Sequence, residues 1–422
     1  MSELLTFLGD QLIGTLRRDA RGRIAFAYDD TWCATPEAYP ISLSLPLAAR
    51  EHGHAEVETY LWGLLPDNEV ILDRWAKRFQ VSARNVFKLL EHVGEDCAGA
   101  VWFCRAERAN AVRRSSGIDW LDEAGLAHRL RALRSDASAW RAIDDEGQFS
   151  LGGAQAKTAL AFDGKRWGIP RGRRPTTHIL KPGLTDLAGH AENEHFCLRL
   201  ARELGLPAAA SRVVRFRDEV AIAVERFDRI RSGDSVVRVH QEDLCQALGL
   251  QPSQKYESDK GPGTKAVVGL LREHSSAAND DVDTFIDALV YAWLIGGTDA
   301  HAKNYSVLIG ANGRARLAPL YDLASALPYH PQRLRKLKLA MKIGGKYRLH
   351  EIGGYQFRKL ATETRTDADA GRARLTAMVS HLPDAAADVA REMRREKHTH
   401  PIVEQLVSAL AARATECATT LR

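Results

Sequence analysis

Three polar side chains in the second half of the chain have the types and spacing that phosphoryl transfer needs. Asp299 and Asn304 lie five positions apart in the segment GGTDAHAKN (296–304), between an apolar helical run and the apolar run YSVLIG. Catalytic loops of protein kinases have the same interval, in which the Asp orients the acceptor hydroxyl and the Asn holds Mg²⁺. Asp322 follows at the end of the next apolar run. A second carboxylate there favours a metal site, so the trio predicts chemistry that depends on ATP and Mg²⁺.

A lysine earlier in the chain is suited to hold phosphate groups. Lys181 ends a short apolar strand, from which its ammonium can reach the α- and β-phosphates of a nucleotide. In the helix that follows, Glu192 begins a stripe whose other members are apolar. A carboxylate on such a stripe needs a cation as partner. We therefore expect Glu192 to form an ion pair with Lys181, with Glu194 as the alternative.

A glycine-rich turn, residues 152–157 (GGAQAK), precedes the β-rich part of the chain. Paired glycines let backbone N–H groups approach an anion, which favours a phosphate-binding loop. Residues 158–162 have the pattern of a strand, so the segment is not a Walker A motif, which would continue into a helix. A plain hairpin between two strands is the alternative.

The end of the last apolar strand is a candidate for adenine recognition. Glu225, Arg226 and Phe227 follow the run VAIAV and precede the helical half of the chain. A hinge at this place would offer backbone groups to an adenine. A charged strand end without a ligand is the alternative.

The elements that must position these residues form an α+β chain. Period-2 alternation followed by a 3.6 period predicts a small α+β module at the N-terminus. We expect a helix over 119–141, a second from about Glu192 to Leu204, and a third over 239–250. The predicted divisions are an N-terminal subdomain (1–105), a helical connector (106–148), a β-rich lobe (149–235) and a helical lobe (236–422). Their order predicts a two-lobed, protein-kinase-like fold with a cleft between the lobes.

Composition excludes several classes of protein. The chain has 422 residues, 45% hydrophobic and 27% charged, and a net charge of +5. This mild charge argues against an obligate nucleic-acid-binding protein. The six cysteines form no C-x-x-C pair and are typical of a cytoplasmic protein. Neither a secretory signal nor a membrane span of about 18 apolar residues is visible. A basic stretch from Arg333 to Arg348 is interpreted as a solvated face or a phosphate-binding surface.

Over essentially its whole length the chain resembles the HipA family, the serine/threonine-protein kinase toxins of type II toxin–antitoxin modules. The resemblance lies in the motifs GTLRRD, YLWGLLPDNEVI, SLGGAQAKTAL, HILKP, ENEHFCLRLARELGL, VERFDR, HQEDLCQALG, GGTDAHAKNYSVL and LAPLYDLAS. It implies that Asp299 is the catalytic residue and that Asn304 and Asp322 are Mg²⁺ ligands. It also implies that phosphorylation of Ser150 by the kinase itself ejects the phosphate loop. The predicted ATP-binding residues are Gly152, Gly153, Ala154, Gln155, Ala156, Lys157, Lys181, Glu225, Arg226, Phe227, His301, Lys303 and Tyr321.

The same resemblance implies partners. We expect a HipB-like helix-turn-helix antitoxin as a separate chain, because this sequence has no segment of that kind. Operator DNA would be contacted indirectly through that antitoxin. The protein substrate would be a translation component such as glutamyl-tRNA synthetase. Two alternatives stay open: a kinase of the same fold that acts on a small molecule or lipid head group, and a non-catalytic corepressor that uses its basic loops.

Overall fold

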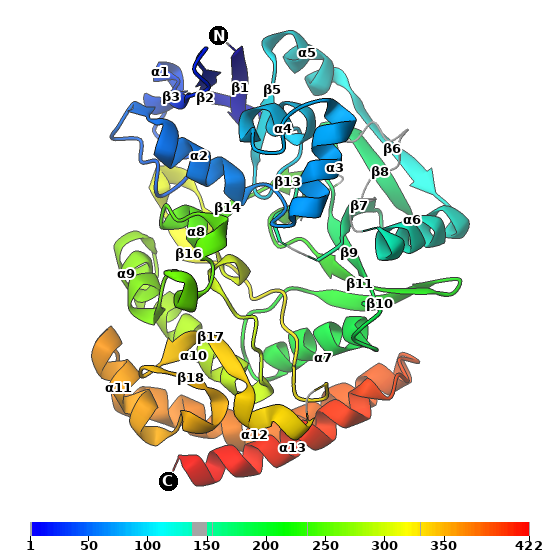
Figure 1. Cartoon of the computed structure of the whole chain (residues 1–422), viewed down its shortest axis with the longest axis vertical. Helices are drawn as coiled ribbons and strands as arrows, with labels where there is room; N and C mark the ends of the chain where they lie inside the picture. The colour runs from blue at the N-terminus through cyan, green and yellow to red at the C-terminus, as the bar shows by residue number, and fades with distance from the viewer. Residues whose placement is uncertain (1, 137–149, 154, 234, 330, 422) are drawn as a thin grey trace.

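The computed structural model describes residues 2–136, 150–153, 155–233, 235–329 and 331–421 (Figure 1). The N-terminal module, residues 2–105, is built on a five-stranded antiparallel sheet of order β4-β3-β2-β1-β5. Apolar side chains of this sheet and of the module's helices form most of one core, which also includes Leu133 from outside the module. The elements are β1 (Ser2–Leu8), β2 (Gln11–Arg18), β3 (Ile24–Tyr28), α1 (Asp30–Cys33), β4 (Glu51–His52), α2 (His54–Gly63), α3 (Glu69–Phe79), α4 (Val86–Val93) and β5 (Val101–Cys104).

A six-stranded antiparallel sheet of order β10-β11-β9-β7-β8-β6 forms the second part. Two helices cover its opposite faces. Ala221 and Ala223 of β11 pack with residues of α6, whereas Ile222 and Val224 belong to the core that contains α7. The elements are β6 (Ser116–Leu121), α6 (Glu123–Ser135), β7 (Thr158–Phe162), β8 (Trp167–Gly172), β9 (His178–Pro182), α7 (His190–Glu203), β10 (Ser211–Phe216) and β11 (Glu219–Glu225).

The segment predicted as a helical connector is only partly helical. It begins with α5 (Ala106–Arg114), but β6 then pairs with β8 at the edge of the sheet. The expectation of a helix from residue 119 is therefore wrong, because α6 begins at Glu123. Asp122 sets this boundary: its carboxylate accepts a bond from the Gly125 amide and caps the helix. Residues 137–148 of the predicted connector lie outside the described part of the chain.

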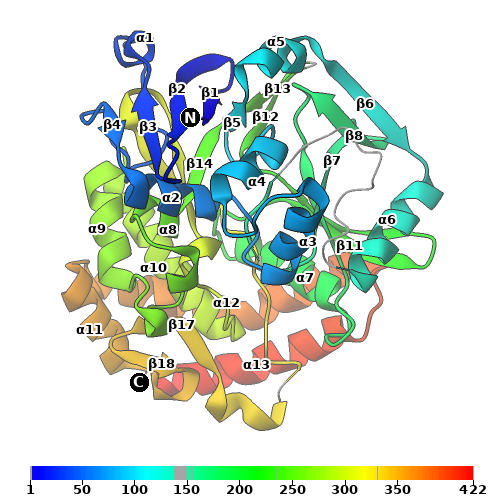
Figure 2. The ribbon, with the colours of Figure 1, turned by 45° about the horizontal axis from the view of Figure 1, so that its top comes forward.

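The helical lobe contains a small sheet of β14, β15 and β16, against which α9 and α10 pack, and the hairpin of β12 and β13 precedes it in the chain. In Figures 1 and 2, α12 and α13 lie side by side along the face farthest from the N-terminal module. The elements are β12 (Arg229–Ser232), β13 (Ser235–Arg238), β14 (His240–Asp243), α8 (Leu244–Ala247), α9 (Thr264–His274), α10 (Ala278–Ile295), β15 (Ser306–Ile309), β16 (Ala315–Leu317), β17 (Lys338–Ile343), β18 (Lys346–Arg348), α11 (Gly354–Thr364), α12 (Ala368–Arg395) and α13 (Ile402–Thr420), with short 3₁₀ turns at 252–254, 257–259, 302–304, 311–313, 331–336 and 349–351.

The helix predicted over 239–250 is also wrong in its first half. Residues 240–243 form β14, which pairs with β15, and α8 is a short helix after it. Asp243 starts that helix through a capping box with Gln246, which ends the strand at this point.

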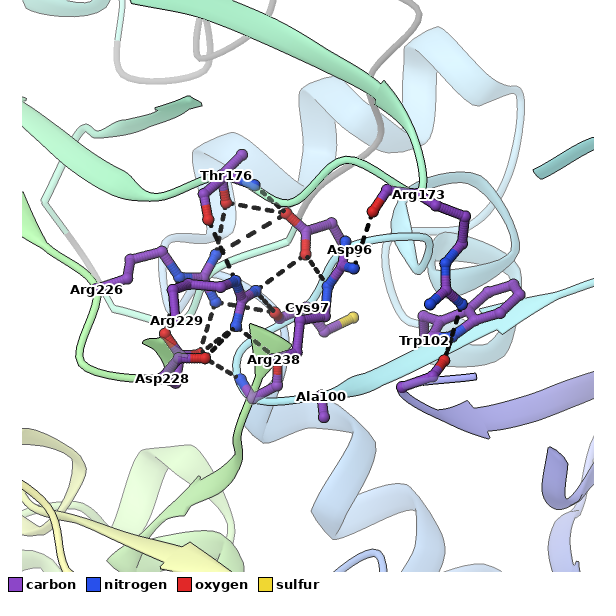
Figure 3. A network of polar contacts seen from close by, with 12 residues as sticks. Asp96, Cys97, Ala100, Trp102, Arg173, Thr176, Arg226, Asp228, Arg229 and Arg238 are labelled. Carbon is purple, nitrogen blue, oxygen red and sulfur yellow. Dashed lines mark hydrogen bonds and ion pairs between the residues drawn. The ribbon is translucent and has the colours of Figure 1, made fainter. Parts of the chain in front are cut away.

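Buried charges join the N-terminal module to the rest of the chain (Figure 3). Asp96 of the module accepts bonds from Arg229 at 3.0 Å and from Arg238 at 3.3 Å. Asp228 pairs with Arg226 at 2.8 Å and with Arg229 at 2.9 Å. Burial opposes the charge on Asp96, but the three guanidinium groups hold the pKa of that carboxyl below its usual range. Each of these buried charges has a partner of opposite sign, so separating the module would expose or strand several of them.

Glu242 forms a second link across this boundary. Its carboxyl, on β14, accepts a bond from the Leu43 amide of the N-terminal module at 2.8 Å. Burial raises the pKa of Glu242 to about 8, despite the bonds from Leu43 and Ser42. The boundary therefore contains a carboxyl that holds its proton at neutral pH.

No helix in the described part of the chain is both long and apolar enough to cross a membrane.

The Glu242→Gln variant should remove a pH dependence of stability. Between the ordinary Glu pKa of about 4.3 and about 8, folded Glu242 keeps a proton that the unfolded chain has lost. The free energy of unfolding should thus decrease as pH rises through this window, by up to about 1.4 kcal/mol per pH unit. Urea denaturation at pH 6 to 9 should show a shallower decrease for Glu242→Gln than for wild type, and no change of slope for the exposed control Glu37→Gln. If the unfolding free energies of Glu242→Gln and wild type depend on pH in the same way, Glu242 is not the buried carboxyl that keeps its proton at neutral pH.

Candidate active site

A cavity of about 610 Å³ lies where the N-terminal module, the six-stranded sheet and the helical lobe meet. Its volume is in the range of small-ligand sites. Most of the predicted site residues line it, although they come from five separate segments of the chain. These lining residues are Gly152, Gly153, Gln155, Lys157, Lys181, Glu225, Arg226, Phe227, Asp299, His301, Lys303, Asn304, Tyr321 and Asp322. Ala156 instead packs against the core of the N-terminal module, and Ala154 lies outside the described residues.

The loop with the predicted catalytic residue is held by its own backbone. Helix α10 ends at Ile295, and the following Gly296 has a φ of +64°, a conformation that favours glycine. The Asn304 side chain donates to the Asp299 carbonyl at 2.8 Å, which closes the loop. The Asp299 carboxylate itself is 65% exposed and faces the cavity. An exposed, fixed carboxylate at a cavity wall can accept a proton from a hydroxyl that enters it.

Tyr256 also contacts this carboxylate, and nothing in the sequence pattern singled it out. Its hydroxyl donates to Asp299 Oδ1 at 2.5 Å, and its ring stands edge-on to that of His301 at 4.9 Å. Burial and then Asp299 raise the pKa of the Tyr256 phenol, so it remains a donor at neutral pH. The residue lies in the polar loop at 252–264, where no periodicity indicates a contact with a residue 43 positions away.

Lys181 is held between two carboxylates. Its Nζ lies 2.7 Å from Glu194 Oε1 and 2.6 Å from Asp322 Oδ1. Burial would lower the pKa of this ammonium, but Asp322 and Glu194 raise it above its usual value. Burial likewise opposes the charge on Asp322, whose pKa is held below its usual range by Lys181 and then Lys157. Both groups are therefore charged at neutral pH.

The predicted pair between Lys181 and Glu192 is wrong, because Glu194 takes that place. Glu192 lies at a different cavity, beside Arg215 and His398. Residues 191–198 of α7 are all buried, so an apolar stripe does not select one carboxylate of this helix over another. The tertiary position of the helix against β9 makes the choice.

Asp322 has a φ of +56°, which is uncommon for a residue other than glycine. Such a backbone persists only where the surroundings enforce it, and it often occurs at functional sites. Asn304 and Asp322 both line the cavity and offer an amide and carboxylate oxygens. Hard oxygen ligands of this type suit Mg²⁺, so the donor set fits the predicted metal.

The glycine-rich turn forms an open loop at the cavity. Gly153 has a φ of +99°, and a Cβ at this residue would come within 2.6 Å of Lys157 Nζ. Lys157 donates to the Gly152 carbonyl at 2.6 Å. Burial and then Lys181 lower the pKa of Lys157 to about 8. A bound anion would offset the repulsion between the Lys157 and Lys181 ammonium groups, which is consistent with a phosphate-binding loop.

Ser150, just before this loop, is fully buried. Its Oγ donates to the Leu64 carbonyl at 2.6 Å, and its amide donates to the Asp96 carbonyl at 2.9 Å. The hydroxyl is therefore enclosed by the N-terminal module in this arrangement.

The predicted hinge also lines the cavity. Phe227 and Tyr321 lie with their ring centroids 5.4 Å apart, and both face the cavity. The Tyr321 hydroxyl is fixed by Ser306 at 2.7 Å and donates to the Lys303 carbonyl at 2.8 Å. The Arg226 guanidinium instead belongs to the buried cluster of Figure 3. The Arg226 side chain is thus taken up by this cluster, and its backbone amide donates to the Thr177 carbonyl at 2.9 Å.

The basic stretch 333–348 is partly neutralised. Lys342 lies 3.3 Å from Glu257, and both Lys346 and Arg348 lie within 4 Å of Glu351. The side chain of Arg333 lies outside the described part of the chain. These pairs favour the interpretation of this stretch as a solvated face.

Comparisons with known proteins agree with this geometry. Residues 149–396 match the family profile described as "HipA-like C-terminal domain", and residues 4–104 match the "HipA N-terminal domain". The chain is 36% identical over 385 residues to the putative kinase Y4mE of Sinorhizobium fredii, which covers 90% of each chain. It is 30% identical over 397 residues to the serine/threonine-protein kinase toxin HipA of Shewanella oneidensis, covering 90% of this chain and 88% of the relative.

A solved structure is similar over nearly the whole chain. It is the Shewanella oneidensis toxin–antitoxin complex of HipA, HipB and operator DNA, in which the matched chain has a TM-score of 0.84 and 26% identity. The match covers 99% of this chain and 97% of that chain. The predicted α+β, two-lobed architecture with an N-terminal subdomain is confirmed.

Replacement of Glu194 should destabilise the protein more than replacement of Glu192. Glu194→Gln removes a buried negative charge from Lys181 and should lower the free energy of unfolding by about 2 kcal/mol. Glu192→Gln, a matched change on the same helix, should cost clearly less, because it leaves the Lys181–Glu194 ion pair intact. Urea denaturation of both variants measures the difference. An equal or larger loss of unfolding free energy in Glu192→Gln would mean that the Lys181–Glu194 contact does not contribute to stability.

Proposed function

The chain belongs to the HipA family of kinases, and from this premise we propose that it transfers the γ-phosphoryl group of ATP to a serine or threonine hydroxyl of a protein. In this proposal it requires Mg²⁺ and acts as the toxin of a type II toxin–antitoxin module. The division into an N-terminal subdomain (1–105), a connector (106–148), a β-rich lobe (149–235) and a helical lobe (236–422) is part of the same proposal.

The observation that supports the proposal most strongly is the convergence of Lys181, Asp299, Asn304 and Asp322 on one cavity. Phosphoryl transfer needs little covalent help from a protein, because positioning and charge compensation supply most of the catalysis. Asp299 would orient the acceptor hydroxyl and accept its proton. Lys181, fixed by two carboxylates, would bind the phosphates at one place.

Asn304 and Asp322 would hold Mg²⁺. When bound, the ion would neutralise charge on the phosphate oxygens. The loop Gly152–Lys157 would enclose the phosphates with its backbone amides. The adenine would lie against the hinge at Glu225–Phe227, beside the Phe227 and Tyr321 rings, and His301 and Lys303 would complete the ATP site.

Autophosphorylation of Ser150 is part of the proposal and requires a rearrangement. The Ser150 hydroxyl is bonded to the Leu64 carbonyl and has no exposed surface. A phosphate cannot be added there unless the loop first leaves its place. Once added, the two negative charges would face the same amides as the ATP phosphates and prevent the loop from returning.

The proposed partner is a HipB-like antitoxin, a separate helix-turn-helix chain that contacts operator DNA on behalf of the complex. The similar structure from Shewanella oneidensis contains HipA, HipB and operator DNA, which supports this assignment. The proposed substrate is a translation component, with an aminoacyl-tRNA synthetase as the family precedent. A cytoplasmic location follows from such a partner and substrate.

Asp299→Asn should abolish phosphoryl transfer without loss of fold. Loss of the group that accepts the hydroxyl proton should slow the reaction at least about 100-fold. The purified protein is incubated with γ-labelled ATP and Mg²⁺ in a lysate of cells that lack the antitoxin, and phosphorylated residues are mapped by mass spectrometry. Asp73→Asn, at an exposed position of α3 away from the cavity, is the matched control.

Label on protein serine or threonine residues, lost in Asp299→Asn and kept in Asp73→Asn, is the expected result. Label only on a small molecule or lipid would instead favour a kinase with another acceptor. Failure to bind nucleotide would favour the corepressor. Full phosphoryl transfer by Asp299→Asn would refute the catalytic assignment.

A further inference from the structure

We propose that the N-terminal module is part of the active site and that its Asp67 is a positioning residue. Asp67 lies in the turn between α2 and α3, which contacts both the phosphate loop and the catalytic loop. This inference rests on the proposed kinase function. It adds that the turn sets the position of the two loops relative to each other.

The phosphate loop is attached to this turn through backbone contacts. Pro66 and Gly153 form a parallel bridge, and the Asp67 amide donates to the Gly153 carbonyl at 3.4 Å. A Cβ on Gly152 would lie 3.0 Å from the Gly63 carbonyl, so the two backbones are in close contact. The loop that would enclose the ATP phosphates therefore takes its position from residues of the N-terminal module.

The Asp67 carboxylate contacts the catalytic loop from the same turn. Its Oδ1 lies 3.5 Å from Nζ of Lys303, which stands between Asp299 and Asn304 in the sequence. Its Oδ2 accepts a bond from Lys255 Nζ at 3.2 Å. One carboxylate thus links two lysines of the helical lobe to the N-terminal module.

Lys255 in turn belongs to the segment that holds Asp299. Its carbonyl accepts a bond from the Ala302 amide at 3.1 Å, inside the catalytic loop. The next residue, Tyr256, donates to the Asp299 carboxylate at 2.5 Å. Asp67 therefore acts on Asp299 from two sides, through Lys303 and through Lys255 and Tyr256.

Burial makes this charge hard to replace. The Asp67 side chain is 9% exposed and that of Lys303 is 3% exposed. Burial alone would lower the pKa of Lys303, but Asp243 and then Asp67 raise it above its usual value. Without the Asp67 charge, Lys303 keeps the Asp243 carboxylate and the Gly63 carbonyl as partners, and Lys255 loses the carboxylate that its ammonium contacts.

The module itself should stay in place when Asp67 is changed. The cluster around Asp96, the Glu242–Leu43 bond and the bond from Gln246 to the Tyr60 carbonyl at 3.0 Å hold it independently. The backbone contacts to Gly153 do not involve the carboxylate. Asp67→Asn should thus disturb the loops more than the fold.

The test compares full-length Asp67→Asn with Asp73→Asn, a matched change on the exposed side of the same module. In the γ-labelled ATP assay, kcat of Asp67→Asn should fall about tenfold or more, since small misplacements of catalytic groups have large effects. The dissociation constant for an ATP analogue should change much less than kcat, and Asp67→Glu should recover part of the rate. Asp73→Asn should match wild type.

Double substitution tests whether Asp67 acts through Lys255. Asp67→Asn combined with Lys255→Gln should be no slower than the slower single variant, because both remove the same link. If Asp67→Asn does not fold, Lys255→Gln alone must show the fall in kcat with nucleotide binding retained. A wild-type kcat in Asp67→Asn would overturn this inference and leave the proposed kinase function standing. The same holds if the losses of kcat in the two single variants multiply in the double variant. A wild-type protein without any phosphoryl transfer would overturn the proposed function and this inference with it.

Discussion

The buried ammonium of Lys181, between the carboxylates of Glu194 and Asp322, is the contact on which the architecture of the cavity depends. It joins strand β9, helix α7 and the segment after β16 at one point. A buried charge of this kind is stable only while its partners stay in place, so the contact fixes the sheet relative to the helical lobe. The left-handed backbone of Asp322 fits this view, because the surroundings hold it there.

The N-terminal module is joined by the same physical principle. Asp96, Asp228 and three arginines contact one another with side chains that are each less than 10% exposed, and each carboxylate faces more than one guanidinium group. Such a boundary favours one arrangement, whereas an apolar boundary of equal size would tolerate sliding. These buried ion pairs therefore fix the N-terminal module closely enough for Leu64, Pro66 and Asp67 to form hydrogen bonds and backbone contacts with loops of the other lobes.

Local spacing predicted Asp299, Asn304, Asp322 and Lys181 because each lies at a fixed distance from an apolar run that becomes a helix or strand. Local spacing was insufficient where a choice depended on tertiary position. Because residues 191–198 of α7 are all buried, the apolar stripe could not select Glu194 over Glu192 as the partner of Lys181. The run 239–250 has a helical pattern, but residues 240–243 pair with β15 and the Asp243 cap starts a helix only after them. Tyr256 and Asp67 were missed as site residues, since both lie in polar turns that have no periodic signal. For Asp67, its place in the motif YLWGLLPDNEVI was a cue, but it did not indicate the partner lysines.

The central claim is that nucleotide and metal bind between these lobes on residues that the free protein already holds in position. A crystal structure with a non-hydrolysable ATP analogue and Mg²⁺ tests it most directly. We predict a metal ion bound to Asn304 and Asp322, phosphates between Lys181 and the loop Gly152–Lys157, and the terminal phosphate facing Asp299. A nucleotide bound outside this cavity, or a metal held by other residues, would contradict the account.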